Sequence, residues 1–91
     1  MKVLWSPQAE SERDAVIAYI AEENLLAALG LLDRFEALAD RLAQFPRMGK
    51  PGRVEGTREL VAHEHYVLVY EFFEREIHIL SLLHTARNYP P

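Results

Sequence analysis

The residues with the clearest capacity for chemistry lie near the end of the sequence. His84, Arg87 and Tyr89 follow the last strand-like run. Arg58 belongs to an earlier run. A histidine exchanges protons near neutral pH, and an arginine can bind a phosphate through two parallel hydrogen bonds. Together these side chains could cleave RNA by general acid–base catalysis. The alternative, which the spacing alone favours, is that Arg87 pairs with an acid while Tyr89 packs its ring on a sheet.

Two further histidines, His63 and His65, alternate along an extended segment. Because side chains alternate across a strand, both imidazoles would lie on one side, where they could hold a metal ion. No carboxylate or third ligand has a suitable spacing. We therefore expect two surface histidines, no metal site and no cofactor.

Three strand-like runs must position these side chains. Residues 52–61, 66–72 and 77–83 follow one another closely, so hairpins are favoured. The second and third runs are apolar at both alternating positions, which is typical of strands covered on both faces. Only one helical layer is available. We therefore expect the second face of the sheet to be partly bare and to attract a binding partner.

A short strand and a helix are expected at the start of the chain. Lys2–Trp5 is the strand candidate, with a large aromatic side chain for the core. Ser6 can cap a helix, and Pro7 suits the first helical position. These signals predict a helix from about Gln8 to about Glu23.

A second, strongly amphipathic helix follows. Asn24 is its candidate N-cap, and Pro46 ends it. Its apolar residues recur at i, i+3, i+4 and i+7, which indicates one face packed on a core. Leu25, Leu26 and Leu29 lie off this stripe. We expect them to pack in the core of the helix pair. The alternative is an exposed patch that binds a partner.

The same helical and strand spacings predict a core. Buried apolar surface is the main driving force of folding, so these positions should decide stability. The side chains expected to be largely buried are Trp5, Ile17, Ile20, Leu31, Phe35, Leu38, Leu42, Leu68, Tyr70, Ile79 and Leu83.

A connector rich in turn-forming residues joins the second helix to the strands. It covers residues 47–53 and reads Arg-Met-Gly-Lys-Pro-Gly-Arg. A loop of glycine and basic residues can cradle phosphate, but this one lacks the spacing of a P-loop. We therefore expect a solvated connector.

Charge is unevenly distributed. The net charge is −4, yet residues 46–58 carry Glu55 as their one acid against Arg47, Lys50, Arg53 and Arg58. A protein that grips a nucleic-acid backbone over a wide face usually carries more positive charge. The balance favours a protein partner, or a small anionic contact at one site.

Length and composition predict one small domain covering residues 1–91. The absence of cysteine excludes a disulfide, a thiol nucleophile and a cysteine-type zinc site. No apolar run approaches the ~18 residues that suggest a membrane-spanning helix. The N-terminus also lacks a signal-peptide pattern. We therefore expect a cytoplasmic protein with no membrane partner.

Several segments together resemble the RelE/ParE superfamily of toxins, which belong to type II toxin–antitoxin modules that include plasmid-stabilisation systems. The likeness covers nearly the whole chain, since Trp5, Ser6-x-x-Ala9 and Tyr19-Ile20-Ala21 also match the usual opening. The combination of Gly56-Thr57-Arg58-Glu59-Leu60 with His84-x-x-Arg87 is the most specific part. The other matching segments are Pro46-x-x-Gly49-Lys50-Pro51-Gly52-Arg53-Val54, Tyr66-Val67-Leu68-Val69-Tyr70 and Ile79-Leu80-x-x-Leu83.

The resemblance implies an α+β fold of order β-α-α-β-β-β, in which a helical hairpin packs on a small antiparallel sheet. It also implies a growth-inhibiting toxin and a cognate antitoxin that wraps it to form a hetero-oligomer. The residues that we assign to antitoxin binding are Leu25, Leu26 and Leu29.

Two targets divide this superfamily. ParE-like members inhibit DNA gyrase, whereas RelE-like members cut mRNA in the ribosome. The stretch around Gly56-Thr57-Arg58 looks more like ParE-type members, and an acidic protein is poorly suited to dock on ribosomal RNA. We therefore favour gyrase, with target contacts at Lys50, Arg53, Arg58 and Arg87. For a ribosome-dependent mRNA endonuclease, the candidate catalytic residues are Arg58, His84, Arg87 and Tyr89. A third alternative is a non-toxic protein-binding relative.

Overall fold

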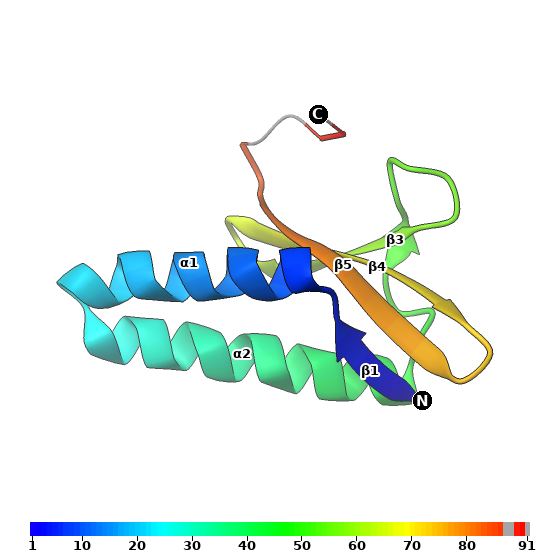
Figure 1. Ribbon diagram of the computed structural model, residues 1–91, viewed down its shortest axis with the longest axis horizontal. Helices are drawn as coiled ribbons and strands as arrows, with labels where there is room; N and C mark the ends of the chain where they lie inside the picture. Colours follow the sequence, from blue (N-terminus) through cyan, green and yellow to red (C-terminus); the bar gives the residue numbers. More distant parts are fainter. Residues whose placement is uncertain (87–88, 91) are drawn as a thin grey trace.

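The computed structural model describes residues 1–86 and 89–90, which form two helices and one five-stranded sheet (Figure 1). The candidate Arg87 lies outside the described residues. In chain order the elements are β1 (Lys2–Trp5), α1 (Pro7–Glu23), α2 (Leu25–Gln44), β2 (Lys50–Pro51), β3 (Arg58–His63), β4 (Tyr66–Phe73) and β5 (Glu76–His84).

The sheet has the strand order β1-β5-β4-β3-β2. β3, β4 and β5 form an antiparallel meander. The expected order and the helical hairpin on a sheet are confirmed, although the sheet is mixed, because β1 runs parallel to β5. Lys50 and Pro51 of the connector are exposed as predicted, but they form a short strand rather than a loop. These two residues pair as β2 with Glu59 and Arg58 at the edge of the sheet.

Both helices begin at the predicted caps. Ser6 accepts a hydrogen bond from the N–H of Ala9 at 3.0 Å and donates one to the carbonyl of Leu80 at 3.0 Å. This one side chain therefore starts α1 and ties it to β5. Asn24 caps α2 by accepting from the N–H of Ala27. No helix in the described part of the chain is long and apolar enough to cross a membrane.

The core lies between the two helices and the sheet. Of the predicted core residues, four are half-buried: Trp5, Ile17, Ile20 and Leu38. The others are buried: Leu31, Phe35, Leu42, Leu68, Tyr70, Ile79 and Leu83. The Phe35 ring meets the ring of Tyr66 edge-on, with centroids 6.1 Å apart.

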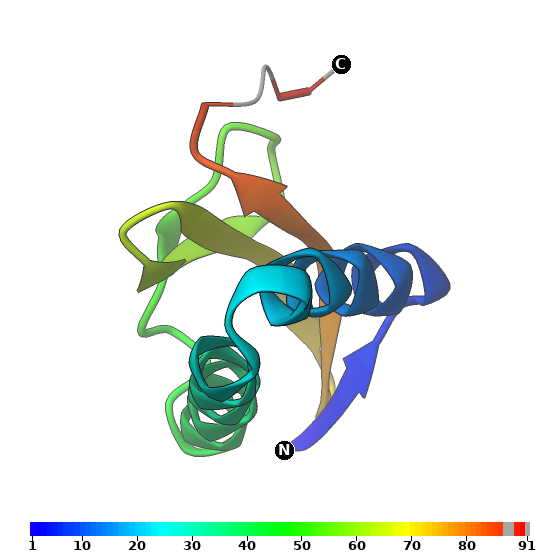
Figure 2. The same cartoon turned by 90° about the vertical axis from the view of Figure 1, so that its left-hand side faces the viewer.

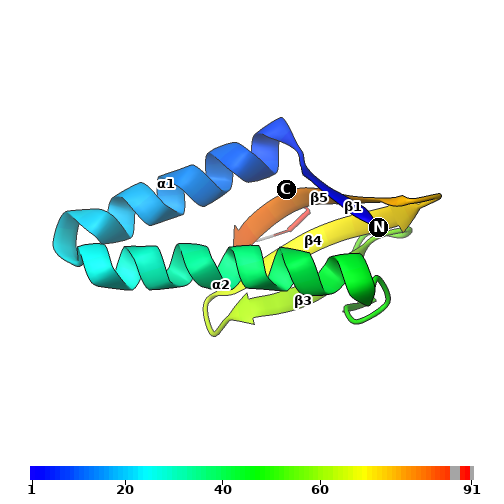
Figure 3. The same cartoon turned by 90° about the horizontal axis from the view of Figure 1, so that it is seen from below.

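The tip of the helical hairpin has no strand beneath it. α1 and α2 extend beyond the end of the sheet (Figures 1 and 3). Leu25, Leu26 and Leu29 in the first turns of α2 are therefore 61%, 81% and 47% exposed. The prediction that these leucines pack in the core is wrong, and the alternative of an exposed apolar patch describes their position.

The second face of the sheet is covered at its centre and bare at its ends. Val67, Val69 and Leu83 point away from the helices, yet they are buried. The loop between β2 and β3 lies on this side (Figure 2), with the Tyr89 ring beside its Arg53. By contrast, Leu4, Val61 and Phe73 on the same face are 37%, 61% and 54% exposed. The prediction of a partly bare second face is therefore confirmed at these three residues and wrong at the centre.

Candidate functional site

The segment between α2 and β2 is held by two side chains of the sheet. The buried Tyr70 hydroxyl donates to the carbonyl of Pro46 at 2.7 Å and accepts from the N–H of Gly49 at 2.9 Å. Arg58 donates to the carbonyl of Gly49 at 2.7 Å and to that of Arg47 at 3.4 Å. Burial raises the pKa of the Tyr70 phenol, although the Gly49 N–H and the Arg58 charge oppose this. Tyr70 therefore keeps its proton and acts as a structural donor.

Gly49 is needed at this point because no side chain fits. A Cβ on Gly49 would lie 2.7 Å from the Tyr70 hydroxyl and 2.8 Å from the carbonyl oxygen of Glu59. Real Cβ atoms essentially never come this close to another heavy atom. The glycine thus lets the connector approach the sheet closely enough for Tyr70 and Arg58 to bind its backbone.

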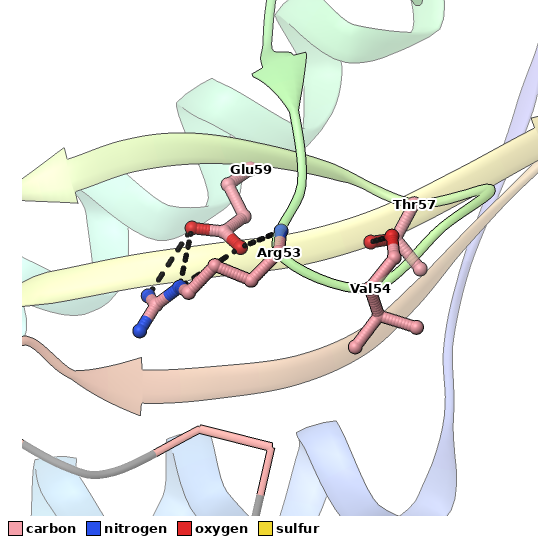
Figure 4. A network of polar contacts seen from close by, with 4 residues as sticks. All are labelled: Arg53, Val54, Thr57 and Glu59. Atoms are coloured by element: carbon pink, nitrogen blue, oxygen red, sulfur yellow. Dashed lines mark hydrogen bonds and ion pairs between the residues drawn. The ribbon is translucent and has the colours of Figure 1, made fainter.

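The loop between β2 and β3 is anchored by a carboxylate (Figure 4). Glu59 on β3 has a side chain that is 4% exposed. It accepts from the backbone N–H of Arg53 at 2.8 Å and from the Arg53 guanidinium at 3.1 to 3.2 Å. Burial raises the pKa of the Glu59 carboxyl, but these hydrogen bonds and the charges of Arg53 and Lys50 lower it more. Glu59 is therefore ionised at neutral pH and fixes the loop.

The rest of this loop is closed by two hydrogen bonds to backbone carbonyls. The Gly52 N–H donates to the carbonyl of Thr57 at 2.8 Å, and the Thr57 hydroxyl donates to the carbonyl of Val54 at 2.6 Å (Figure 4). Gly56 has a φ of 85°, which favours glycine. Gly52 and Gly56 therefore shape this loop.

Of the four cations proposed as target contacts, the structure describes three: Lys50, Arg53 and Arg58. Arg53 and Arg58 use their guanidinium groups within the fold, on Glu59 and on connector carbonyls. Lys50 is exposed at the sheet edge. The Tyr89 ring lies beside Arg53, 5.6 Å from its guanidinium carbon. Arg87 is outside the described residues.

His84 belongs to an aromatic cluster at the far end of the sheet. Its ring stacks on that of His65 with centroids 5.6 Å apart, and it meets the ring of Tyr66 edge-on. The ring of His63 lies 6.0 Å from that of His65. Among the described residues, no group of three or more His, Asp or Glu side chains is arranged to hold a metal ion.

Arg58 and His84 lie far apart. Their partners on β4 are Tyr70 and Tyr66, respectively. These partners are four residues apart along one strand, which corresponds to about 13 Å. Tyr89 lies beside Arg53, which binds Glu59 on the opposite face of the sheet. Within the described residues, the candidate acid–base groups therefore do not converge on one point.

A model of the ParE toxins of type II toxin–antitoxin systems (parDE) matches residues 3–89 of this chain. The chain belongs to the ParE toxin family. The match includes the two-helix hairpin, the connector and the whole sheet. The expected superfamily membership is therefore confirmed, and the chain is a ParE-like toxin of a type II toxin–antitoxin system.

Relatives of known sequence support this membership. The Y4kP protein of Sinorhizobium fredii is 33% identical over 90 residues, which cover 98% of this chain and 93% of the relative. Toxin RelE2 of Caulobacter vibrioides is 33% identical over 86 residues, which cover 94% of this chain and 97% of the relative. Each alignment therefore covers nearly the full length of both this chain and the relative.

A solved structure shares the fold. It comes from a chromosomal ParDE system of P. aeruginosa and has a TM-score of 0.82 at 22% identity. The match covers 92% of this chain and 95% of the solved one. At this level of identity it supports the ParE fold rather than any particular site.

Sequence reasoning missed three residues that build this region. All three belong to segments that match the family, but the sequence pattern assigned Glu59 no further role, Tyr70 only a place in the core and Gly49 only a place in the turn-rich connector. Their roles depend on contacts with residues far along the chain, such as Pro46 to Tyr70. One signal in the sequence could have found Glu59 and Tyr70. Both place a polar group at a strand position expected to be buried, and buried polar groups need hydrogen-bond partners.

Proposed function

We propose that this ParE-like toxin inhibits DNA gyrase and that a cognate antitoxin neutralises it. The observation that carries the choice of target is the separation of Arg58, His84 and Tyr89. General acid–base cleavage requires its proton donors and acceptors within hydrogen-bond reach of one substrate. Inhibition of an enzyme by binding carries no such requirement. The match to the ParE rather than the RelE branch supports the same choice.

The ParE family implies an antitoxin partner, and we place part of its contact on the hairpin tip. Leu25, Leu26 and Leu29 form the leucine patch, which the fold leaves exposed. Tyr19 on α1 is also 75% exposed. An amphipathic helix of the antitoxin can cover such a surface with apolar residues spaced three and four apart. The toxin would then act, and be neutralised, in the cytoplasm as part of a plasmid-stabilisation module.

The antitoxin proposal is tested by co-expression. The toxin alone should express poorly or aggregate, and the product of a neighbouring short gene should rescue it. Leu26→Ser should weaken the purified complex by about tenfold or more in dissociation constant, since buried leucines contribute roughly 1.5–3 kcal/mol. Ala37→Ser, on an exposed position of α2 outside the patch, is the control. Equal affinity of both variants would remove the leucine patch from the interface.

A second candidate function is ribosome-dependent mRNA cleavage, since one relative carries the name RelE2. Brief induction of the toxin distinguishes the two targets. A gyrase inhibitor should stop DNA synthesis first, activate the DNA-damage response and make cells filament while translation continues. Purified toxin should inhibit gyrase supercoiling and stabilise cleaved DNA. An immediate stop in protein synthesis with codon-positioned mRNA cuts would instead support the nuclease. In that case His84→Ala and Tyr89→Phe should reduce activity, typically 10²–10⁴-fold for a general acid or base.

A further inference from the structure

An exposed aromatic side chain lies beside an arginine where α2 meets the connector. Phe45, the C-cap residue of α2, is 56% exposed, and it lines a hollow together with the exposed Arg47. The Arg47 guanidinium carbon lies 5.5 Å from the centroid of the Phe72 ring, and that of Arg58 lies 5.9 Å from it. We call Phe45, Arg47, Met48 and Phe72 the connector face.

The connector face is apolar at its centre. Gln44, Phe45, Pro46, Arg47 and Met48 line a shallow hollow of about 540 Å³. Aromatic residues, methionine and arginine are enriched in protein–protein interfaces relative to the rest of the surface. Phe45, Arg47 and Met48 bring these three residue types together around one hollow.

The backbone beneath this face is fixed before any partner arrives. Tyr70 holds Pro46 and Gly49, while Arg58 holds the carbonyls of Arg47 and Gly49. The Phe45 N–H also donates to the carbonyl of Arg41, and its carbonyl accepts from Met48. A surface that is ordered in advance loses less conformational entropy on binding. The internal role of Arg58 thus positions Arg47 and its neighbours.

Charge indicates the chemistry of the occupant. The whole chain has a net charge of −4, but the connector face carries the Arg47 guanidinium, and that of Arg58 lies beside the same Phe72 ring. Complementary potentials favour a partner of opposite sign and speed its approach. The connector face covers only a few side chains, whereas proteins that bind a DNA backbone present a wider basic surface. The occupant that fits is therefore a protein surface on which carboxylates surround an apolar side chain.

We propose that the connector face is the surface through which this toxin contacts its target, and that it binds an acidic, partly apolar patch of gyrase. This inference rests on the proposed function and adds Phe45 and Arg47 to the target-binding residues. It also separates the two partners in space, because the leucine patch lies at the opposite end of α2.

Gyrase supercoiling assays with purified toxin variants test this surface. Arg47→Gln and Phe45→Ser should each raise the toxin concentration for half-inhibition by about tenfold or more, as expected for central interface residues. Ala18→Glu on the exposed side of α1 lowers the net charge by the same one unit as Arg47→Gln. Leu4→Ser removes an exposed apolar side chain from β1, at the opposite edge of the sheet. Both control variants should inhibit like the original toxin, and urea unfolding should confirm that all four are folded. Phe45→Gln replaces Phe45→Ser, and Arg47→Ala replaces Arg47→Gln, if either variant does not fold.

The possible outcomes distinguish a failure of the proposed surface from a failure of the proposed function. If the original toxin inhibits gyrase and the connector-face variants inhibit equally well, the surface is wrong and the function stands. If the original toxin never inhibits gyrase, both proposals fail. Fluorescence anisotropy of a labelled DNA duplex with toxin alone provides the third result. Binding that is lost in Arg47→Gln would identify DNA as the occupant and overturn the protein partner.

Discussion

Arg53 binds the carboxylate of Glu59 twice, through its backbone N–H at 2.8 Å and through its guanidinium at 3.1 Å. One of these contacts comes from the fixed backbone of Arg53, and the other comes from its flexible side chain. The carboxylate is buried, whereas the arginine side chain is 44% exposed. This pair fixes the loop over the second face of the sheet, and its energetics can be measured directly.

Removing the arginine side chain should destabilise the toxin. Arg53→Ala leaves a buried carboxylate with the backbone N–H of residue 53 as its remaining contact in this pair. We expect a lower free energy of unfolding, because the buried carboxylate loses its charged partner, although water screens part of this effect. The measurement is urea denaturation followed by circular dichroism. Arg47→Ala, at an exposed position, should change this free energy by less than about 0.5–1 kcal/mol. The same midpoint for both variants would contradict a stabilising role for the pair.

The Glu59 pair should also make stability depend on pH in the acid range. Despite the opposing effect of burial, its net folded-state pKa lies below the ordinary value because of the bonds from Arg53. The stabilisation is therefore present above the unfolded pKa of about 4.3 and is lost as pH falls through the lower folded value. Glu59→Gln cannot titrate. The stability difference between the original toxin and Glu59→Gln should shrink from about pH 6 to about pH 3. A constant difference across this window would show that Glu59 does not contribute through its charge.

Two glycine substitutions should act in opposite directions. Gly49→Ala would place a Cβ 2.7 Å from the Tyr70 hydroxyl, so we expect a loss of about 1–3 kcal/mol as the connector shifts. Gly30 lies within α2 and a Cβ there meets nothing within 4 Å. Gly30→Ala should therefore stabilise the toxin by up to about 1 kcal/mol. Thermal unfolding of both variants is the measurement. A stabilised Gly49→Ala would mean that the connector does not need its close approach to Tyr70.

The aromatic core should depend strongly on Phe35. This side chain is fully buried and contacts the Tyr66 ring. Phe35→Ala should cost roughly 3–5 kcal/mol because it removes buried surface and leaves a cavity. Tyr19→Ala, at a position that is 75% exposed, should change stability little. An unchanged midpoint and m-value for Phe35→Ala in urea would remove Phe35 from the core.

Local chemistry made the helices and most of the core predictable. Ser6 and Asn24 satisfy the first N–H groups of their own helices, so their effect lies within a few residues. Phe35 and Leu42 follow a helical spacing that a single face must bury. These features need no knowledge of how distant segments meet.

Features that depend on distant contacts could not be predicted in the same way. Leu25 and Leu26 are apolar and helical, but whether a strand lies beneath them depends on how far the hairpin extends past the sheet. Burial of Val69 depends on a loop that Glu59 anchors. The candidate target contacts Arg53 and Arg58 were chosen for their charge, yet that charge is used inside the fold. Type and spacing alone do not distinguish a free cation from one with an internal partner.

The parallel pairing of β1 with β5 affects the order in which this toxin folds during synthesis. Ser6 and Leu80, which are joined by a hydrogen bond, lie 74 residues apart in the chain. β1 therefore has no partner strand until nearly the whole domain has left the ribosome, while α1 and α2 can already pair with each other. Contacts of such long sequence separation form late and slow the folding of small domains. A nascent toxin thus presents its helices, including the leucine patch, before its sheet is complete. An antitoxin that binds the leucine patch can reach the helices before the finished toxin exists.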